Sequence, residues 1–189
     1  MKPEQPKAPR KRATTPRRAG HPEPRRVAFV EPSFRLKSIL VPVDFSEPSR
    51  KGLRYACAMA DYFDARITLL FVLEPVFSPD FNYFPLALDT GGALRNAEKK
   101  LRAWAKEESA GLGRVDNILV WQGKPYLEIC EAARALNIDL VVIATHGHTG
   151  VKRVWLGSTA ERVVREAPCP VLVVRPHGHE FIIDTPKSL

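Results

Sequence analysis

The sequence contains few of the features that define secreted, metal-binding or membrane proteins. It has 3 cysteines in 189 residues, and Cys57, Cys130 and Cys169 are isolated, with neither a CxxC pair nor the spacing of metal ligands. Isolated thiols in apolar contexts indicate buried cysteines in a reducing compartment. No segment approaches the ~18 apolar residues of a membrane helix or has the apolar core of a signal peptide. The sequence therefore predicts a soluble cytoplasmic protein without membrane association.

Acidic residues are scarce near the amino terminus, and the net charge of the chain arises there. The formal charge of the whole chain is +8. Residues 1–35 hold 10 Lys and Arg against 3 Glu, which gives +7, so residues 36–189 carry only +1. Residues 1–35 also contain 7 of the 17 prolines, a composition that predicts a disordered basic tail. Nucleic-acid binding would rest on this tail alone, and such charge runs are usually solvated segments, so nucleic acid is not the expected partner.

After the tail, short apolar runs alternate with longer segments of helical period. The runs are rich in β-branched residues and apolar on consecutive positions, which is typical of strands that are covered on both faces of a parallel sheet. They lie at residues 38–43, 66–72, 117–121, 139–145 and 170–176. Residues 74–92 fit neither period and are expected to form a partly ordered excursion.

The segments between the runs each carry one apolar stripe with the spacing of a helix face. The four stripes are Leu53, Ala56, Cys57, Ala60 and Phe63; Leu94, Ala97, Leu101 and Trp104; Tyr126, Ile129, Cys130, Ala133 and Leu136; and Ala160, Val163, Val164 and Ala167. Right-handed crossovers would place such helices on both faces of the sheet. Residues 36–176 are therefore predicted to form one α/β domain with an open five-stranded parallel sheet, and residues 177–189 a C-terminal tail.

The connection after the fourth apolar run, residues 144–162, is longer than a simple turn requires. Its three glycines, Gly147, Gly150 and Gly157, would let the backbone turn and let a ligand approach closely. Ser158 stands three residues before Glu161, which predicts a capping box at the start of the last helix. The amides at a helix start attract anions. Ligands of open parallel sheets bind where the strand order reverses, so this loop and the segment after the first run are expected to face one crevice.

Four separated segments resemble the universal stress protein family, in the family's order and across residues 36–176. They are PVDFSEPS, LLFVLEP, GKPYLEI and ATHGHTGVKRVWLGSTAERVVREAPCPVLVVRP. The resemblance implies a five-stranded α/β fold, dimerisation through the last strand, and either an ATP-binding or a non-binding protein. The ATP-binding members carry a Gly-x2-Gly-x9-Gly-(Ser/Thr) motif. Here Gly147, Gly157 and Ser158 match it, whereas Ala144 replaces the first glycine.

The resemblance also implies which residues would contact the nucleotide. Asp44 and its neighbours would meet the adenosine end, the Val72 backbone would meet the adenine, and the glycine-bearing loop would surround the phosphates. The implied site consists of Pro42, Val43, Asp44, Val72, Ala144, Thr145, His146, Gly147, His148, Gly150, Gly157, Ser158 and Thr159. The implied cofactor is ATP, with or without Mg²⁺.

Several of these residues have a second interpretation. Asp44 is either a ligand contact or a residue of the turn before a helix that Ser46 caps. Lys152 and Arg153 are either phosphate contacts or surface charges. The paired histidines of this loop and those near the C-terminus, His177 and His179, are too few for a metal site, which needs three or four converging ligands.

The sequence therefore predicts a dimeric regulatory or stress-response protein that binds ATP. The alternative is an interaction module of the same fold that binds no nucleotide, which Ala144 favours. The chain has no GxxxxGK(S/T) loop and no recognisable group to orient a water molecule, so ATP hydrolysis is expected to be slow at most.

Overall fold

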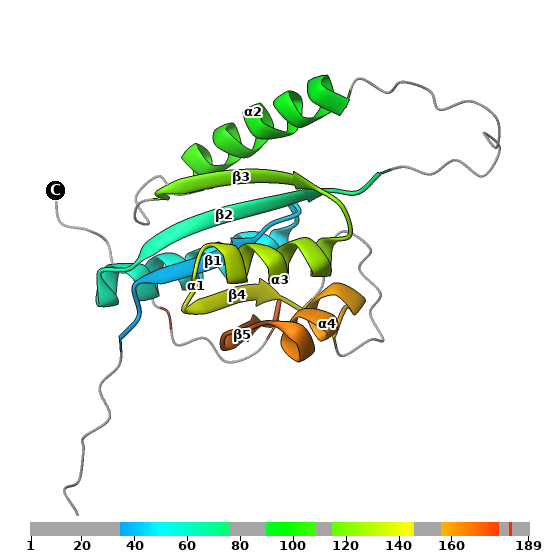
Figure 1. Cartoon of the computed structure of the whole chain (residues 1–189). Helices are drawn as coiled ribbons and strands as arrows, with labels where there is room; N and C mark the ends of the chain where they lie inside the picture. The colour runs from blue at the N-terminus through cyan, green and yellow to red at the C-terminus, as the bar shows by residue number, and fades with distance from the viewer. Residues whose placement is uncertain (1–34, 76–89, 109–114, 146–155, 178–181, 183–189) are drawn as a thin grey trace, which may run out of the picture. The chain divides into compact units, whose positions relative to one another are not determined.

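A computed structural model describes residues 35–75, 90–108, 115–145, 156–177 and 182, all within the compact unit Phe34–Leu189. In these segments five strands alternate with four helices (Figure 1). The elements are β1 (Ser38–Pro42), α1 (Glu47–Phe63), β2 (Arg66–Leu73), α2 (Thr90–Glu108), β3 (Asn117–Gln122), α3 (Pro125–Ala135), β4 (Leu140–Ala144), α4 (Ser158–Glu166) and β5 (Val171–Val174). All five predicted strands and all four predicted helices are present, and the predicted α/β class is confirmed.

The strands form one parallel sheet in the order β3-β2-β1-β4-β5. The chain first proceeds from β1 to β2 and β3 and then returns to β4 and β5 on the other side of β1. The strand order therefore reverses between β1 and β4, where Ile39 pairs with Leu140 and Leu40 with Val141.

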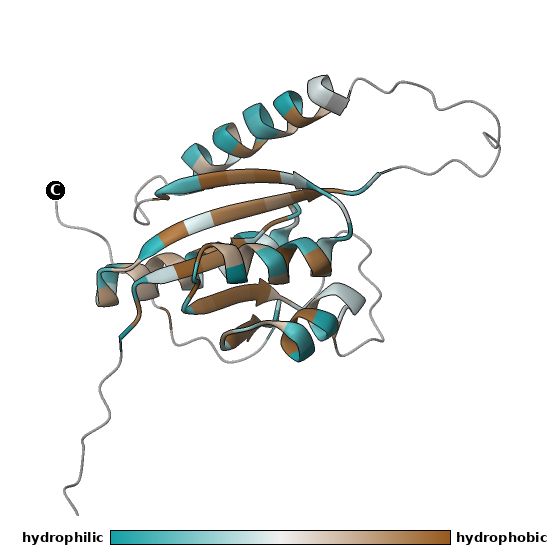
Figure 2. Ribbon diagram, viewed as in Figure 1, coloured by the Kyte–Doolittle hydropathy of each residue, from teal (hydrophilic) through white to brown (hydrophobic). Residues whose placement is uncertain are grey.

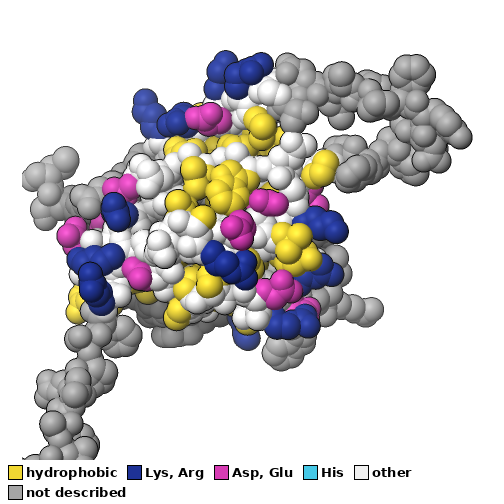
Figure 3. Space-filling model, viewed as in Figure 1, with side chains coloured by type: hydrophobic (Ala, Val, Ile, Leu, Met, Phe, Trp, Pro, Cys, Tyr) yellow, Lys and Arg dark blue, Asp and Glu magenta, His cyan; other side chains and the backbone are white. Residues whose placement is uncertain are grey.

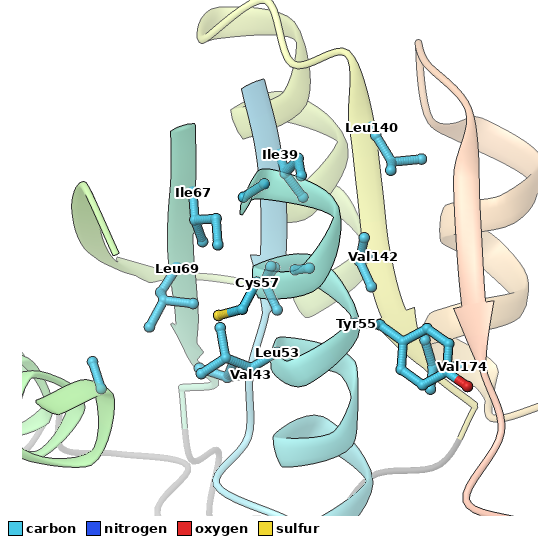
Figure 4. Close-up of a cluster of buried hydrophobic side chains, with 14 of the residues drawn as sticks. Ile39, Val43, Leu53, Tyr55, Cys57, Ile67, Leu69, Leu140, Val142 and Val174 are labelled. Atoms are coloured by element: carbon cyan, nitrogen blue, oxygen red, sulfur yellow. The ribbon is translucent and has the colours of Figure 1, made fainter. Parts of the chain in front are cut away.

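The helices cover both faces of the sheet, as the apolar stripes predict. Side chains of α1 and α2 pack with alternate strand residues in one buried cluster, which includes Leu53 and Cys57 of α1 (Figure 4). The intervening strand residues pack with α3 and α4 in a second cluster, around Ile129 and Val163. Figure 2 shows strands that are hydrophobic along most of their length and helices that are hydrophobic on one side. The strands bury both faces, which explains their continuous apolar runs.

Two stripe residues are exposed, contrary to the helical pattern. Leu136 is 43% exposed and Val164 is 48% exposed. Leu136 lies one residue beyond the last turn of α3, so its side chain no longer follows the buried face of that helix. Val164 follows the fully buried Val163, and the ~100° rotation between successive helical residues turns it away from the sheet.

The three cysteines are free thiols, and the predicted burial is confirmed for two of them. Cys57 and Cys130 are buried and Cys169 is half-buried. Burial raises the pKa of the Cys130 and Cys169 thiols, because desolvation disfavours the thiolate. Both thiols are therefore less reactive than an exposed cysteine.

A carboxylate joins two strands at the edge of the sheet where the strands begin. Asp139 Oδ2 accepts hydrogen bonds from the backbone amides of Lys37 and Ser38, at 2.8 and 2.9 Å, and from Ser38 Oγ at 3.0 Å. These bonds, the Lys37 amide first, lower the pKa of Asp139 below its usual value. The contact connects the start of β1 to the start of β4.

The chain continues to contact the domain after β5. Lys51 Nζ of α1 donates to the carbonyl oxygen of Pro176 at 3.1 Å. Ile182, within the segment predicted to be a tail, packs against the cluster under α1 and α2.

The charged side chains on the surface agree with the nearly neutral charge of residues 36–189 (Figure 3). Figure 3 shows basic and acidic side chains interspersed on the viewed face, around several hydrophobic side chains. Among the described residues, no helix is long and apolar enough to span a membrane.

Candidate functional site

A cavity of about 640 Å³ opens at the edge of the sheet where the strands end. Residues from the ends of β1, β2 and β4 and from the first turns of α3 and α4 line it. These elements flank the reversal of strand order between β1 and β4, where ligands of open parallel sheets bind. The cavity is therefore at the position that the sequence predicts for a crevice.

Nine of the thirteen predicted site residues line this cavity. They are Pro42, Val43, Asp44, Val72, Ala144, Thr145, Gly157, Ser158 and Thr159. The other four, His146, Gly147, His148 and Gly150, lie outside the described residues, as do Lys152 and Arg153. The fold thus brings together residues that are up to 117 positions apart in the chain, from Pro42 to Thr159.

The wall after β1 is formed by a turn that also starts α1. Asp44 Oδ1 accepts hydrogen bonds from the Ser46 amide at 3.0 Å and from Ser46 Oγ at 2.5 Å. Ser46 caps α1, because its Oγ accepts from the Ser49 amide at 3.3 Å. Asp44 therefore supports the turn and also lines the cavity, and its contact with a ligand stays a prediction.

Phe45 and Lys100 also line the cavity, and the sequence patterns do not reveal either of them. Phe45 has a φ of 65°, in the left-handed region that a bulky residue rarely adopts. Its ring packs against Phe71 and Trp104, with centroid separations of 4.8 and 6.0 Å. Lys100 Nζ of α2 lies 4.1 Å from the centroid of the same ring. The position of Phe45, an aromatic residue directly after Asp44, was a signal that could have pointed to it. Lys100 has no such signal, because it resembles any exposed lysine of a helix.

The wall after β4 is a regular continuation of the strand. Ala144 is paired with Val174 of β5, and its φ is not positive. The Thr145 amide donates to the Val174 carbonyl at 3.0 Å, and the Thr145 carbonyl accepts from the Gly157 amide at 2.7 Å. An alanine fits this extended conformation, so the replacement of the first motif glycine causes no backbone strain.

The predicted capping box at the start of α4 is wrong. Gly157 is the N-cap and makes no side-chain capping bond, and Ser158 is already the first helical residue. Glu161 is thus one turn inside the helix, where its carboxylate pairs with Arg165 at 2.9 Å instead of reaching back. The first turn of α4 faces the cavity without a side-chain oxygen as its cap, which leaves the positive end of the helix dipole directed at the cavity.

Most of the described residues that line the cavity are apolar. The apolar lining includes Leu70 and Val72 of β2, Ile143 of β4, and Pro125 and Ile129 of α3. The charged lining residues among those described are Asp44, Glu74 and Lys100. Such a cavity suits a ligand with one flat apolar part and several polar or anionic groups.

No group of three potential metal-ligating side chains occurs in the part of the chain that the structure describes. His146, His148 and His179 fall outside that part, and His177 is exposed.

The fold is that of universal stress proteins, and the chain belongs to this family: the model of the universal stress protein family matches residues 35–175. A universal stress protein of Thermus aquaticus is 36% identical over 139 residues, which cover 74% of this chain and 98% of that protein.

Solved structures agree with this assignment. The structure of universal stress protein UspA from Lactobacillus plantarum is similar with a TM-score of 0.61 at 28% identity, over 76% of this chain and 100% of that one. The fold is also shared with a universal stress protein in complex with cAMP, with a TM-score of 0.54 at 22% identity, over 75% of this chain and 98% of that one.

Proposed function

We propose that this protein binds an adenine nucleotide, ATP in the first place, in the cavity at the end of β1 and β4, and that it acts as a regulatory stress-response protein. The observation that carries the proposal is the convergence of Asp44, Val72 and the first turn of α4 on one cavity with a mostly apolar lining. One solved protein of the same fold is in complex with cAMP. That likeness concerns the fold, so the argument for this chain depends on its own residues.

The two ends of the cavity suit the two ends of a nucleotide. The apolar lining around Leu70, Val72 and Ile129 would hold the base, and the Asp44 carboxylate would accept hydrogen bonds from sugar hydroxyls. The first turn of α4, at Ser158 and Thr159, would meet the phosphates through its amides and the helix dipole. In the family resemblance, His146, Gly147, His148 and Gly150 complete the phosphate end.

Binding of Mg²⁺ would occur through the phosphates of the nucleotide, since ATP is normally bound together with this ion. Asp44 is the carboxylate beside the proposed sugar position, and its Oδ1 already accepts two hydrogen bonds from Ser46. It is therefore poorly placed to activate a water molecule at the last phosphate. The proposed role is binding, with hydrolysis far slower than in dedicated ATPases.

We further propose a homodimer that forms through β5. This strand lies at the edge of the sheet and carries Val171, Leu172 and Val173, which are only half-buried. Apolar edge strands are commonly protected by pairing with a second chain.

The test of nucleotide binding compares wild type with Asp44→Asn by isothermal titration calorimetry with ATP. Asparagine keeps an oxygen that can accept from Ser46, so the turn is preserved while the charge is lost. We expect the affinity to fall about fivefold to tenfold, as for loss of a charge-assisted hydrogen bond. Asp116→Asn is the matched control, because Asp116 accepts from the Ile67 amide far from the cavity, where β2 begins.

Two results would contradict the proposal. Wild-type protein that binds neither ATP nor ADP nor AMP at millimolar concentration would favour the alternative, an interaction module that binds no nucleotide. Equal losses of affinity in Asp44→Asn and Asp116→Asn would show that the effect arises from the fold and not from the cavity.

A further inference from the structure

Lys100 adds a cation to the described lining of the cavity, and it comes from a helix and not from a strand end. It comes from α2, on the face of the sheet opposite to α4. Of the described residues that line the cavity, Lys100 is the one with a positive charge. Its Nζ lies over the ring of Phe45, 4.1 Å from the centroid. A cation over an aromatic face is attracted by the negative face of the ring.

Phe45 is held firmly enough to position this ammonium group. Its backbone has a φ of 65°, a conformation that persists only where the surrounding structure imposes it. Phe71 and Trp104 pack against the ring, at centroid separations of 4.8 and 6.0 Å. Phe45 therefore restricts where the end of the long Lys100 side chain can lie, and it keeps the ammonium at the cavity.

Lys100 also retains its hydrogen-bonding capacity. It forms no ion pair with any residue that the structure describes. By contrast, its neighbour Arg102 on α2 is paired with Glu98 at 2.6 Å. An aromatic face attracts a cation but accepts no conventional hydrogen bond, so no contact within the described residues uses the three N–H groups of Lys100.

We propose that Lys100 binds the phosphate nearest the sugar of the nucleotide. This inference rests on the proposed function, which places the sugar at Asp44. Phe45 follows Asp44 directly in the chain, and both residues line the same cavity as Lys100. The anionic group of a nucleotide closest to its sugar is the first phosphate. Lys100 thus adds to the preference of the site for a nucleotide over a nucleoside.

The experiment measures the affinities of adenosine, AMP and ATP by calorimetry for wild type, Lys100→Gln and Lys99→Gln. Lys99 is an exposed lysine on the same turn of α2 that does not line the cavity, so it controls for the change in net charge. We expect Lys100→Gln to weaken AMP and ATP by the same factor, about fivefold to tenfold. Adenosine should change less than about twofold, since it has no phosphate. Lys100→Arg should recover most of the loss, and Lys99→Gln should resemble wild type.

Three other outcomes would each overturn the inference, and they differ in what they mean for the proposed function. If wild type binds AMP and ATP and Lys100→Gln binds them equally well, the inference fails and the proposed function stands. If Lys100→Gln weakens adenosine as much as AMP, Lys100 contacts the base or the sugar, and the phosphate assignment is wrong. If wild type binds none of the three ligands, both the proposed function and this inference are wrong.

Discussion

The substitution Ala144→Gly tests whether the alanine at the first motif position weakens nucleotide binding. Ala144 is in β4, paired with Val174, and has an extended backbone. Glycine offers conformations with positive φ, but this position uses none of them, so the substitution adds nothing that the native structure needs. Glycine in a strand also loses more conformational entropy on folding than alanine does, at a cost of about 0.5–1 kcal/mol.

We therefore expect Ala144→Gly to lower the free energy of unfolding by about 0.5–1 kcal/mol. The affinity for ATP should stay within about twofold of wild type, a change of about 0.4 kcal/mol. Urea denaturation gives the stability change from the shift in midpoint at an unchanged slope. Calorimetry with ATP gives the affinity, and Ala144→Ser is a control of similar size that retains a Cβ.

A large gain in affinity would refute the reasoning. If Ala144→Gly binds ATP about tenfold more tightly than wild type, or about 1.4 kcal/mol, the methyl group obstructs the ligand and the extended conformation is not the deciding property. The same gain in Ala144→Ser would instead assign the effect to hydrogen bonding by the new side chain, because serine keeps the Cβ.

Four further predictions follow from other parts of the structure. Asp139→Asn should lower the free energy of unfolding by about 1 kcal/mol at neutral pH, a modest value because this carboxylate is exposed and screened. The pKa of Asp139 is lower in the folded state. Its contribution to the free energy of unfolding is therefore present above the ordinary pKa of 3.8 and is lost as the pH falls through the folded pKa. The urea midpoints of wild type and variant should then converge at acidic pH. Gly52→Ala, within helix α1, should raise the free energy of unfolding by about 0.5–1 kcal/mol. The added Cβ would lie in ordinary contact, 3.9 Å from the Ala144 amide nitrogen. A decrease in the urea midpoint would mean that the helix cannot accept the methyl group. Light scattering at micromolar concentration should give the mass of a dimer, and Val173→Asp in β5 should shift the measured mass towards that of a monomer. A wild-type monomer would contradict the proposed edge pairing. Steady-state ATP turnover should remain well below about 1 per second, and a faster rate that Asp44→Asn abolishes would identify an ATPase.

Much of the fold could be predicted because its elements leave local patterns. Consecutive apolar residues such as Leu140 to Ile143 indicate a strand covered on both faces, and the stripe from Leu53 to Ala60 indicates a helix against that sheet. The helical pattern was wrong at Leu136, just beyond the end of α3, and at Val164, next to the buried Val163 within α4, because both side chains are exposed. Hydrophobic periodicity reports burial only while the helix continues and keeps the same face towards its neighbour.

The start of α4 shows why a local motif can be misread. The spacing of Ser158 and Glu161 is that of a capping box, yet Gly157 is the N-cap and Glu161 pairs with Arg165. The position of the cap depends on where the chain enters the helix. Here the Gly157 amide donates a hydrogen bond to the Thr145 carbonyl. Thr145 lies twelve positions earlier, and the spacing of Ser158 and Glu161 does not reveal this contact.

The sequence by itself determined the α/β class, the family and the strand ends at which a ligand would bind, because these depend on local periodicity and on motifs within short segments. Only the tertiary structure decided the strand order, and with it the cavity between β1 and β4. It also decided that Phe45 adopts a left-handed conformation and that Lys100 lies above its ring. The reason is physical: these features arise from packing between segments that are distant in the chain, such as Phe45 with Lys100 and β1 with β4, and such contacts leave no pattern in either segment alone.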